Sequence, residues 1–258
     1  MRPEERRRKI VALVREHRRV SVEFLSDFLD LSRETIRRDL TDLAARGELV
    51  KYHGGAGMSD RGGEGTFEAR LRENFAEKQA IARRAAVLFS PGDSLFIDTG
   101  TTTLYLAEAL SRVSGLTVVT NSSEIARTVA AGEDNEVFLI GGRFVAGASE
   151  CLGALAVEQA DRFRPMHAVI TVGAMDCGGI SDFSLEEAEM ARAMIARARS
   201  LTVVADLSKL GRTALYPICP LASVHRLVTG RLPAGDFASA VRAAGIQLIE
   251  VGGDDGVI

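Results

Sequence analysis

Apolar side chains in the first 57 residues follow a helical period and then a strand period. Between Glu4 and His17 they fall three and four positions apart, and two further short segments repeat this spacing. Ser21 and Ser32 stand just before those segments, where a hydroxyl can cap a helix. The stretch "ELVKYHGG" then alternates apolar and polar residues. We predict three helices and a hairpin, with these apolar residues on the helices: Ile10, Leu13, Val14, Val22, Leu25, Phe28, Ile36, Leu40 and Leu43.

The rest of the chain alternates apolar runs with longer amphipathic segments. Runs such as "LTVVT", "AVITV" and "LTVVA" are continuously apolar, which is typical of strands buried on both faces. The predicted strands are 94–98, 116–120, 136–140, 167–172, 201–205, 226–229 and 246–251. The predicted helices are 76–89, 102–113, 122–131, 153–163, 185–199 and 236–244. This alternation indicates an α/β fold with a mostly parallel sheet between helices.

A glycine-rich segment separates the two patterns. Six of the fourteen residues from Gly54 to Phe67 are glycine, and such a segment buries too little apolar surface to order itself. A length of 258 residues is typical of two domains. We expect a winged helix-turn-helix domain at 1–57, a linker at 58–67, and a larger α/β domain at 68–258.

Composition narrows the classes of protein and of site. The three cysteines and four histidines are scattered, so we expect no disulfide framework, metal site or cofactor. The N-terminus lacks a signal sequence, and no run of about 18 apolar residues occurs, so a cytoplasmic protein without a membrane span is expected. Residues 1–57 hold 13 Lys and Arg against 10 Asp and Glu, while the remainder holds 19 against 25. A basic N-terminal part on an acidic body favours contact with nucleic acid.

The third predicted helix has the outer face that a DNA-reading helix needs. When Ile36, Leu40 and Leu43 point inward, a helical turn of 100° per residue places polar and basic side chains outward. Forked or short donors near the N-terminus can read bases in the major groove, and basic flanks can hold phosphates. A solvated charged helix face is the alternative interpretation. The residues of this face are Arg33, Glu34, Thr35, Arg37, Arg38 and Thr41.

Two groups of motifs resemble the DeoR family of bacterial transcriptional regulators. The N-terminal part carries "LSRETIRRDL" and "LAARGELVKYHGGA", and the body carries "RENFAEKQAIARRAA", "DTGTTT", "VVTNS", "LIGG", "GGISD" and "ADLSKLGR". The resemblance covers the whole chain. It implies a winged helix-turn-helix that binds double-stranded DNA, with Thr35, Arg37 and Arg38 in the recognition helix and Lys51 and His53 in the wing.

The segment "DTGTTT" has the composition of an anion cradle. It follows a predicted strand and opens a helix, where free backbone N–H groups and the helix dipole both favour a phosphate. The carboxyl end of a strand is also where open α/β sheets bind ligands. A plain helix cap is the alternative, and neither a P-loop nor a dinucleotide motif is present. The residues of this candidate site are Asp98, Thr99, Gly100, Thr101 and Thr102.

Other strand ends are expected to converge on the same edge. Asn121 and Ser122 follow one apolar strand, and Lys209 follows another, where its charge could neutralise a bound anion. Asp182 of the "GGISD" loop completes the predicted effector site.

Three functions are compatible with these motifs. The family's body resembles ribose-phosphate isomerases, and an isomerase could use Asp98, Asp182, Glu186, Glu187 and Lys209 for proton transfer and carbonyl polarisation. A third possibility is a metabolic sensor that binds a protein. A stand-alone isomerase has no use for a winged helix on a glycine linker, so the sequence favours a regulator, not an enzyme. We expect a homo-oligomeric repressor of carbohydrate-metabolism genes that a phosphorylated sugar-like effector releases from its operator.

Overall fold

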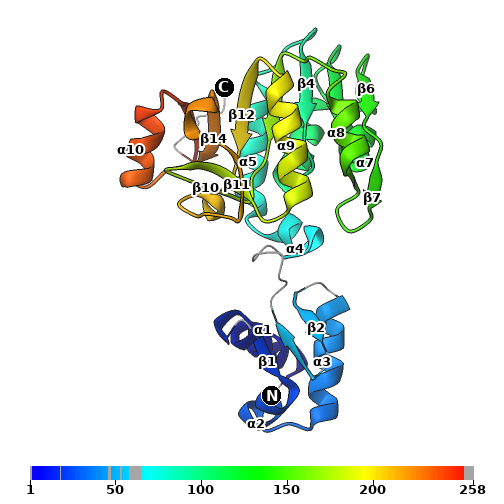
Figure 1. Ribbon diagram of the computed structural model, residues 1–258, viewed down its shortest axis with the longest axis vertical. Coiled ribbons are helices and arrows are strands. Elements are labelled where there is room, and N and C mark those ends of the chain that lie inside the picture. The colour runs from blue at the N-terminus through cyan, green and yellow to red at the C-terminus, as the bar shows by residue number, and fades with distance from the viewer. Residues whose placement is uncertain (1, 18, 46–47, 53, 58–64, 253–258) are drawn as a thin grey trace. The chain divides into compact units, whose positions relative to one another are not determined.

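The computed structural model describes residues 2–17, 19–45, 48–52, 54–57 and 65–252 (Figure 1). The chain divides into two compact units, Met1–Arg72 and Glu73–Ile258. Among the described residues, the elements of the smaller unit are α1 (Pro3–His17), β1 (Arg19–Ser21), α2 (Val22–Leu29), α3 (Arg33–Ala45), β2 (Val50–Tyr52), β3 (Gly55–Gly57) and α4 (Phe67–Arg72).

The core of the smaller unit forms where the helical periodicity predicted it. Ile36 and Leu40 are fully buried and Leu43 is 1% exposed, so the inner face of α3 is confirmed. Ser21 caps α2, because its hydroxyl accepts from the backbone N–H of Phe24 at 2.9 Å. Phe28 does not join the other apolar residues and is 62% exposed. Helical rotation turns Leu29 toward the core in its place.

The wing contains the first glycines of the glycine-rich segment, which begins inside the predicted winged domain at 1–57. β3 is the middle strand of a three-stranded antiparallel sheet in the order β1-β3-β2. A side chain has no room at Gly55, since a Cβ there would lie 2.3 Å from the carbonyl oxygen of Val20. Gly55–Gly57 therefore belong to the wing. Phe67, the last residue of the predicted linker, begins α4, and residues 58–64 lie outside the described part of the chain.

The larger unit is built on a parallel sheet. Within the described residues the strand order is β15-β14-β12-β9-β4-β5-β6, and every neighbouring pair is parallel, which confirms the expected α/β class. The strands are β4 (Ser94–Ile97), β5 (Thr117–Thr120), β6 (Glu136–Leu139), β9 (His167–Ile170), β12 (Ser200–Val204), β14 (Arg226–Gly230) and β15 (Gln247–Val251). The helices are α5 (Phe75–Ala86), α6 (Thr101–Leu110), α7 (Ser123–Val129), α8 (Ala154–Ala160), α9 (Leu185–Arg197) and α10 (Asp236–Ala243).

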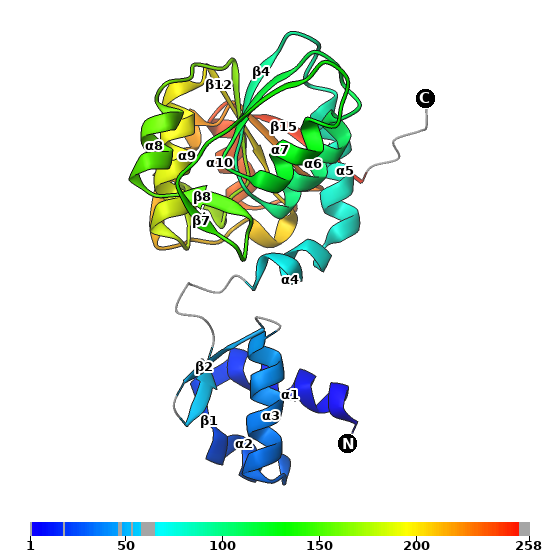
Figure 2. The same cartoon turned by 90° about the vertical axis from the view of Figure 1, so that its right-hand side faces the viewer.

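Helices cover both faces of this sheet (Figure 2). Helices α5, α6 and α7 pack on one face, and α8, α9 and α10 pack on the other. Apart from the edge strands β6 and β15, the strands between them are buried on both sides. In β4, for example, Phe96 faces one cluster of apolar side chains while Leu95 and Ile97 face the other. Continuous apolar runs are the sequence signature of this arrangement.

The hydrophobic pattern did not predict six of the short strands. They are β1, β7 (Arg143–Val145), β8 (Glu150–Leu152), β10 (Ala174–Asp176), β11 (Gly179–Asp182) and β13 (Tyr216–Cys219). Two short 3₁₀ helices also appear, η1 (Leu207–Lys209) and η2 (Leu221–Ser223). Segments of three or four residues are too short to display a period. Several of these elements nevertheless border the candidate site described below.

Gly55→Ala should destabilise the smaller unit by about 1–3 kcal/mol, because the added methyl group overlaps the backbone of β1. Calorimetric unfolding of the full-length chain measures this loss. Gly54→Asn is the matched control: Gly54 has φ = 85° and open space around its Cβ position. Asn tolerates this left-handed backbone better than most residues. Equal losses for the two variants would contradict close strand packing at Gly55.

Candidate functional sites

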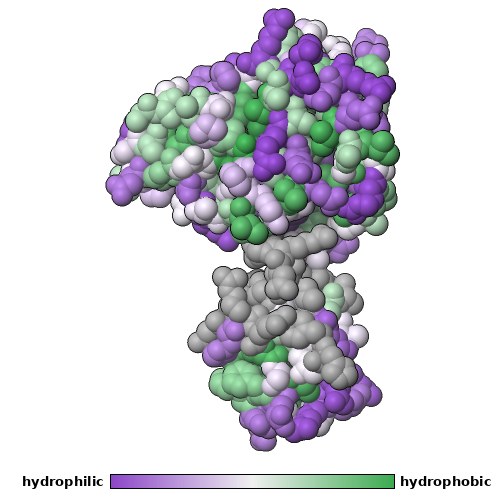
Figure 3. All heavy atoms as spheres, viewed as in Figure 1, coloured by the Kyte–Doolittle hydropathy of each residue, from purple (hydrophilic) through white to green (hydrophobic). Residues whose placement is uncertain are grey.

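Helix α3 presents a polar outer face in the smaller unit. The side chains of Arg37 and Arg38 are 60% and 81% exposed. Glu34 lies between them, with Oε1 3.6 Å from Arg38 Nε and Oε2 4.0 Å from Arg37 Nη1. Arg33 is exposed and pairs with Glu23 of α2. Figure 3 shows hydrophilic residues at the lower end of this unit, where Figure 1 places α2 and the start of α3.

A buried carboxylate sets the orientation of α3. Asp39 is 2% exposed and lies on the inner side of the helix. Arg7 Nε donates to Asp39 Oδ1 at 3.0 Å, and Arg6 Nη2 donates to the same oxygen at 3.1 Å. Both arginines come from α1. A charged group this deeply buried needs such partners. These contacts tie α3 to α1 and leave its opposite face free of the core.

Hydrogen bonds engage the remaining predicted residues of α3 and the wing. The hydroxyl groups of Ser32 and Thr35 are 2.9 Å apart, and Thr35 N donates to Ser32 Oγ at 3.2 Å, which caps the helix. Lys51 of β2 donates from Nζ to Thr41 Oγ1 at 2.8 Å. The wing strand is therefore tied to the exposed face of α3. His53 lies outside the described residues.

The second candidate site lies at the carboxyl edge of the large sheet. Ile97, at the end of β4, is in register with Thr120 of β5 and Val169 of β9. The residues that follow these strand ends, Asp98 and Asn121 among them, therefore meet at one edge. Asp98 Oδ1 accepts a hydrogen bond from Thr171 N at 3.0 Å. The sequence pattern did not identify Thr171.

The start of α6 has the form of an anion cradle. Gly100 precedes the helix in extended conformation, and a Cβ there would lie 2.0 Å from Thr171 Cγ2. Thr101 and Thr102 are buried at 5% and 2% exposure, and the first turn carries no acidic residue. The first amides of a helix have no partners within it. The hydroxyl of Thr99 also has no hydrogen-bond partner among the described residues.

Asn121 and Ser122 are buried and partly engaged in local structure. Ser122 caps α7, since its hydroxyl accepts from Ile125 N at 3.3 Å. Asn121 donates from Nδ2 to the carbonyl oxygen of Cys151 at 3.2 Å, while Asn121 Oδ1 is buried without a hydrogen-bond partner in the described chain. The backbone of Cys151 donates to Asn121 O at 2.8 Å. The β7–β8 hairpin, to which Cys151 belongs, is thereby fixed to the end of β5.

Carboxyl groups from three further elements lie around Asp98. Burial raises the pKa of Asp98 well above its usual value, and the charges of Asp182, Glu187 and Glu150 raise it further. Glu150 of β8 is only 3% exposed. The sequence predicted Asp182 as part of this site, considered Glu187 only for an enzyme, and missed Glu150. A protonated Asp98 can donate a hydrogen bond as well as accept one.

Lys209 is placed by a network of buried polar groups. It ends η1, which follows β12, and the Leu210 beside it forms a bridge to Met175 of β10. Asp206, 1% exposed, caps η1 and accepts from Asn74 Nδ2 at 2.9 Å. Lys78 Nζ lies 3.9 Å from Asp206 Oδ2.

Glu77 adds a second tie between the same two segments. Leu207 N of η1 donates to Glu77 Oε1 at 3.0 Å. Burial raises the pKa of Glu77 despite this bond. Asn74, Glu77 and Lys78 surround the start of α5, so the first turn of the larger unit is joined to the loop that carries Lys209.

The described residues contain neither a candidate membrane span nor a candidate metal site. No helix there is long and apolar enough to cross a lipid bilayer. The same residues contain no group of three or more His, Cys, Asp or Glu side chains that could hold a metal ion.

The chain matches two protein families along its length. Residues 6–61 match the DeoR-like helix-turn-helix domain, and residues 73–231 match the DeoR C terminal sensor domain. The chain is 31% identical to the HTH-type transcriptional repressor CsqR of Escherichia coli over 93% of each chain. It is 30% identical to the glycerol-3-phosphate regulon repressor of the same organism, over 96% of this chain and 99% of the relative. It is 31% identical to the repressor GlcR of Bacillus subtilis over 98% of each.

Similarity to solved structures is weaker. A D-ribose-5-phosphate isomerase in complex with phospho-erythronic acid is 18% identical over 52% of each chain, with a TM-score of 0.38. A TM-score this low supports no conclusion about activity.

Asp98→Asn should become more stable relative to the wild type as the pH rises from 4 to 8. The folded state holds the Asp98 proton more tightly than the unfolded chain, so ionisation costs stability above the ordinary carboxyl pKa. Asn cannot ionise and can still accept the bond from Thr171. Urea unfolding at several pH values measures the difference.

Asp176→Asn is the control, for which the stability relative to the wild type should change with pH in the opposite direction. The hydroxyl of Thr213 lowers the pKa of Asp176, so its ionised form contributes stability that is lost as the pH falls through its folded pKa. Asp176→Asn should therefore lose stability relative to the wild type as the pH rises from the lowered folded pKa to the ordinary carboxyl pKa, so the urea series for this variant extends down to about pH 2. The same direction for both variants would contradict the assignment at Asp98.

Proposed function

The chain belongs to the DeoR family and is a DNA-binding transcriptional regulator, not an enzyme, and we propose that it represses carbohydrate-metabolism genes until a phosphorylated effector binds. We assign DNA binding to residues 1–57 and effector binding to residues 68–258, joined by the linker at 58–67. The named relatives are transcriptional regulators, which act where the chromosome lies, so we place this chain in the cytoplasm.

The exposed face of α3 supports its insertion into the major groove. Arg38, the more exposed of the two central arginines, is assigned to base edges, and Arg37 to phosphate. Glu34 holds both guanidinium groups near the N-terminal half of the helix before DNA is bound. Lys51 brings a positive charge from the wing to the same face. We assign supporting contacts to Arg33, Thr35, Thr41 and His53.

The single observation that carries the effector proposal is the pairing of an anion cradle with carboxyl groups. The N-terminus of α6 suits a phosphate, because its amides and hydroxyls converge with no acid in the first turn. Asp98 and Asp182 suit hydroxyl groups, because carboxyl oxygens accept hydrogen bonds from them. An effector with phosphate at one end and hydroxyls at the other fits both. The name of the glycerol-3-phosphate regulon repressor is consistent with such a molecule.

The remaining effector contacts are assigned from the positions of the side chains at the carboxyl edge of the large sheet. Asn121 and Ser122 are assigned to effector hydroxyls at the end of β5, since Asn121 Oδ1 is buried and accepts no hydrogen bond from the described residues. Lys209 is assigned to the effector's negative charge. Because η1 is bonded to the first turn of α5, a shift of Lys209 toward the effector would pull on the start of α5, which follows α4 and the linker in the chain. Ligand binding can shift the protein only by preferring one conformation over another.

We propose a homo-oligomer because one winged helix-turn-helix domain makes few contacts with DNA, whereas two such domains related by symmetry can read repeated half-sites. The effector then acts by favouring a conformation in which the spacing of these domains does not match the operator.

Arg38→Ala should reduce operator affinity in a sequence-dependent way, by about 1–3 kcal/mol, because it removes a base contact. Arg37→Ala should weaken binding to all duplexes and lower the dependence of affinity on salt. Fluorescence anisotropy with operator and scrambled DNA at several salt concentrations separates the two effects. Unchanged binding for both variants would show that α3 does not bind in the major groove.

Phosphorylated sugars should bind at least about tenfold more tightly than their unphosphorylated forms, a difference of about 1.4 kcal/mol, because charge-assisted bonds hold the phosphate. Calorimetry with glycerol 3-phosphate and ribose 5-phosphate, against glycerol and ribose, measures this ratio. Thr101→Glu should abolish binding by placing a charge in the cradle. Thr99→Val, which keeps the shape but removes one hydroxyl, should lower affinity by about 1 kcal/mol.

Two results would contradict the effector proposal. Equal affinity for sugar and sugar phosphate would exclude the phosphate cradle. Formation of an isomerised product from ribose 5-phosphate would show that the protein is an enzyme.

A further inference from the structure

The edge of the large sheet at β6 is apolar and open. β6 pairs with β5 on one side, and no strand pairs with its other side among the described residues. Phe138 and Leu139 of this strand are 39% and 50% exposed. Exposed edge strands usually carry charges or other features that block further pairing. Two large apolar side chains at such an edge therefore indicate a surface that another chain covers.

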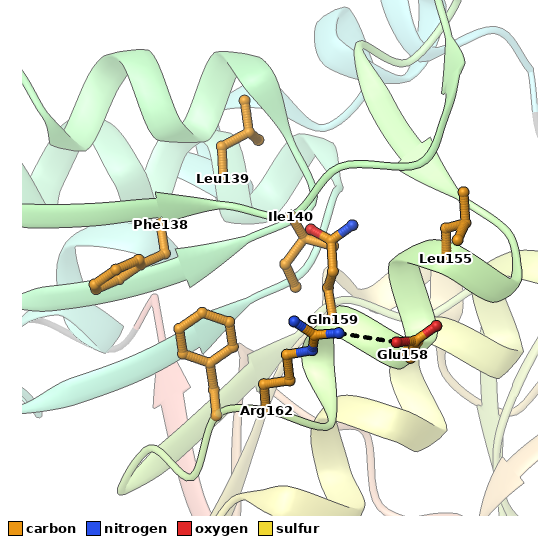
Figure 4. A pocket seen from close by; sticks show the side chains of 8 residues that line it. Phe138, Leu139, Ile140, Leu155, Glu158, Gln159 and Arg162 are labelled. Atoms are coloured by element: carbon orange, nitrogen blue, oxygen red, sulfur yellow. Dashed lines mark hydrogen bonds and ion pairs between the residues drawn. The ribbon is translucent and has the colours of Figure 1, made fainter.

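A groove of about 470 Å³ lies beside this strand (Figure 4). Its walls come from β6 and α8, and Leu155 of α8 is 66% exposed at its border. The rings of Phe138 and Phe163 lie side by side with centroids 5.3 Å apart. Glu158 and Arg162 form an ion pair on the rim, with Arg162 Nη2 donating to Glu158 Oε1 at 2.9 Å. The groove thus has apolar walls and a rim without net charge.

The hydrogen-bond pattern of β6 determines how a second strand would join. Glu136 N donates to Leu116 O and Ile140 N donates to Thr120 O, so these backbone groups point toward β5. Because backbone groups alternate along a strand, the N–H and C=O groups of Val137 and Leu139 point away from the sheet. These groups are the ones that a neighbouring strand would bond.

We propose that this edge binds the same edge of a second copy of the chain, forming an antiparallel β6–β6 pair across a two-fold axis. The axis passes beside Phe138, so that Phe138 faces Phe138 of the second copy in a non-hydrogen-bonded pair. Val137 and Leu139 then lie opposite each other and exchange both of their backbone hydrogen bonds. The proposal rests on the oligomer proposed above and specifies its surface.

Two features favour a second copy over an unrelated partner. A two-fold interface must be self-complementary, with residue i contacting residue j in both directions. Here each outward-pointing backbone group finds its complement in an identical strand, and Glu136 lies opposite Ile140, so like charges do not meet. The rim contributes one acid and one base, so two copies approach without net repulsion. The groove beside Phe138 offers room for the aromatic ring of the second copy.

A cysteine introduced at the axis tests the geometry. In the proposed pair the two Phe138 Cα atoms would be about 4.5 Å apart, within reach of a disulfide. Full-length Phe138→Cys should form a covalent dimer under mild oxidation. Glu136→Cys is the matched control, because the two copies of Glu136 lie at opposite ends of the paired segment. Comparison with the wild type accounts for Cys151, Cys177 and Cys219. No dimer at Phe138→Cys, or equal dimer at both positions, would overturn the proposal.

A charge at the edge tests its contribution to assembly. Leu139→Asp should lower the mass of the full-length protein toward a monomer in sedimentation velocity, with an unchanged circular dichroism spectrum. Leu215→Asp is the control, since Leu215 is 75% exposed and does not line the groove. A wild-type monomer, or an oligomer that survives Leu139→Asp, would overturn the interface.

Binding of wild-type protein to non-specific duplex DNA, measured in parallel, separates this outcome from the proposed function. If the wild type binds DNA as an oligomer but Phe138→Cys gives no covalent dimer, only the interface is wrong. If the interface forms and DNA is not bound, the failure lies in the assignment of α3.

Discussion

The parallel register of the large sheet is the constraint on which the candidate effector site depends. In a parallel sheet every strand ends at the same edge, so residues far apart in sequence meet there. Asp98 follows β4 and Thr171 follows β9, yet one hydrogen bond of 3.0 Å joins them. The same register places Asn121 at the end of β5 and the η1 loop at the end of β12. The helices on both faces bury the strands and hold this register.

Opposing electrostatic requirements are separated within that edge. The start of α6 offers amides and hydroxyls, whereas Asp98, Asp182, Glu187 and Glu150 gather acidic groups beside it. Burial and the neighbouring carboxylates raise the pKa of Asp98, which lowers the negative charge of the cluster. A uniformly anionic ligand would be repelled by the acids, and an uncharged sugar would leave the cradle unfilled. The proposed effector, with a phosphate and several hydroxyls, would satisfy both regions.

Buried polar networks mark the places where elements distant in sequence must keep a fixed relation. In the smaller unit, Asp39 with Arg6 and Arg7 holds α3 against α1. In the larger unit, Asp206 with Asn74 and Lys78 holds η1 against α5. Removing one member of such a network leaves a buried group without its partner, which costs more than the loss of a surface ion pair. Both networks therefore connect a candidate site to the framework behind it, and the second includes the start of α5, the first helix of the larger unit.

The sequence by itself determined the repeating elements and their class, because hydrophobic periodicity is a local property. The inner face of α3, the buried strands, the N-cap at Ser21 and the start of α6 at "DTGTTT" all followed from spacing and local chemistry. Periodicity did not exclude Phe28 from the core, because a two-turn helix leaves its rotation undecided. The predicted hairpin included Gly55, but composition did not show that its backbone packs closely against Val20. Only the tertiary structure placed Thr171 and Glu150 beside Asp98, and only the tertiary structure showed that no described strand pairs with the outer side of β6. Contacts between separate elements depend on the strand order, and the hydrophobic period of the sequence does not reveal that order.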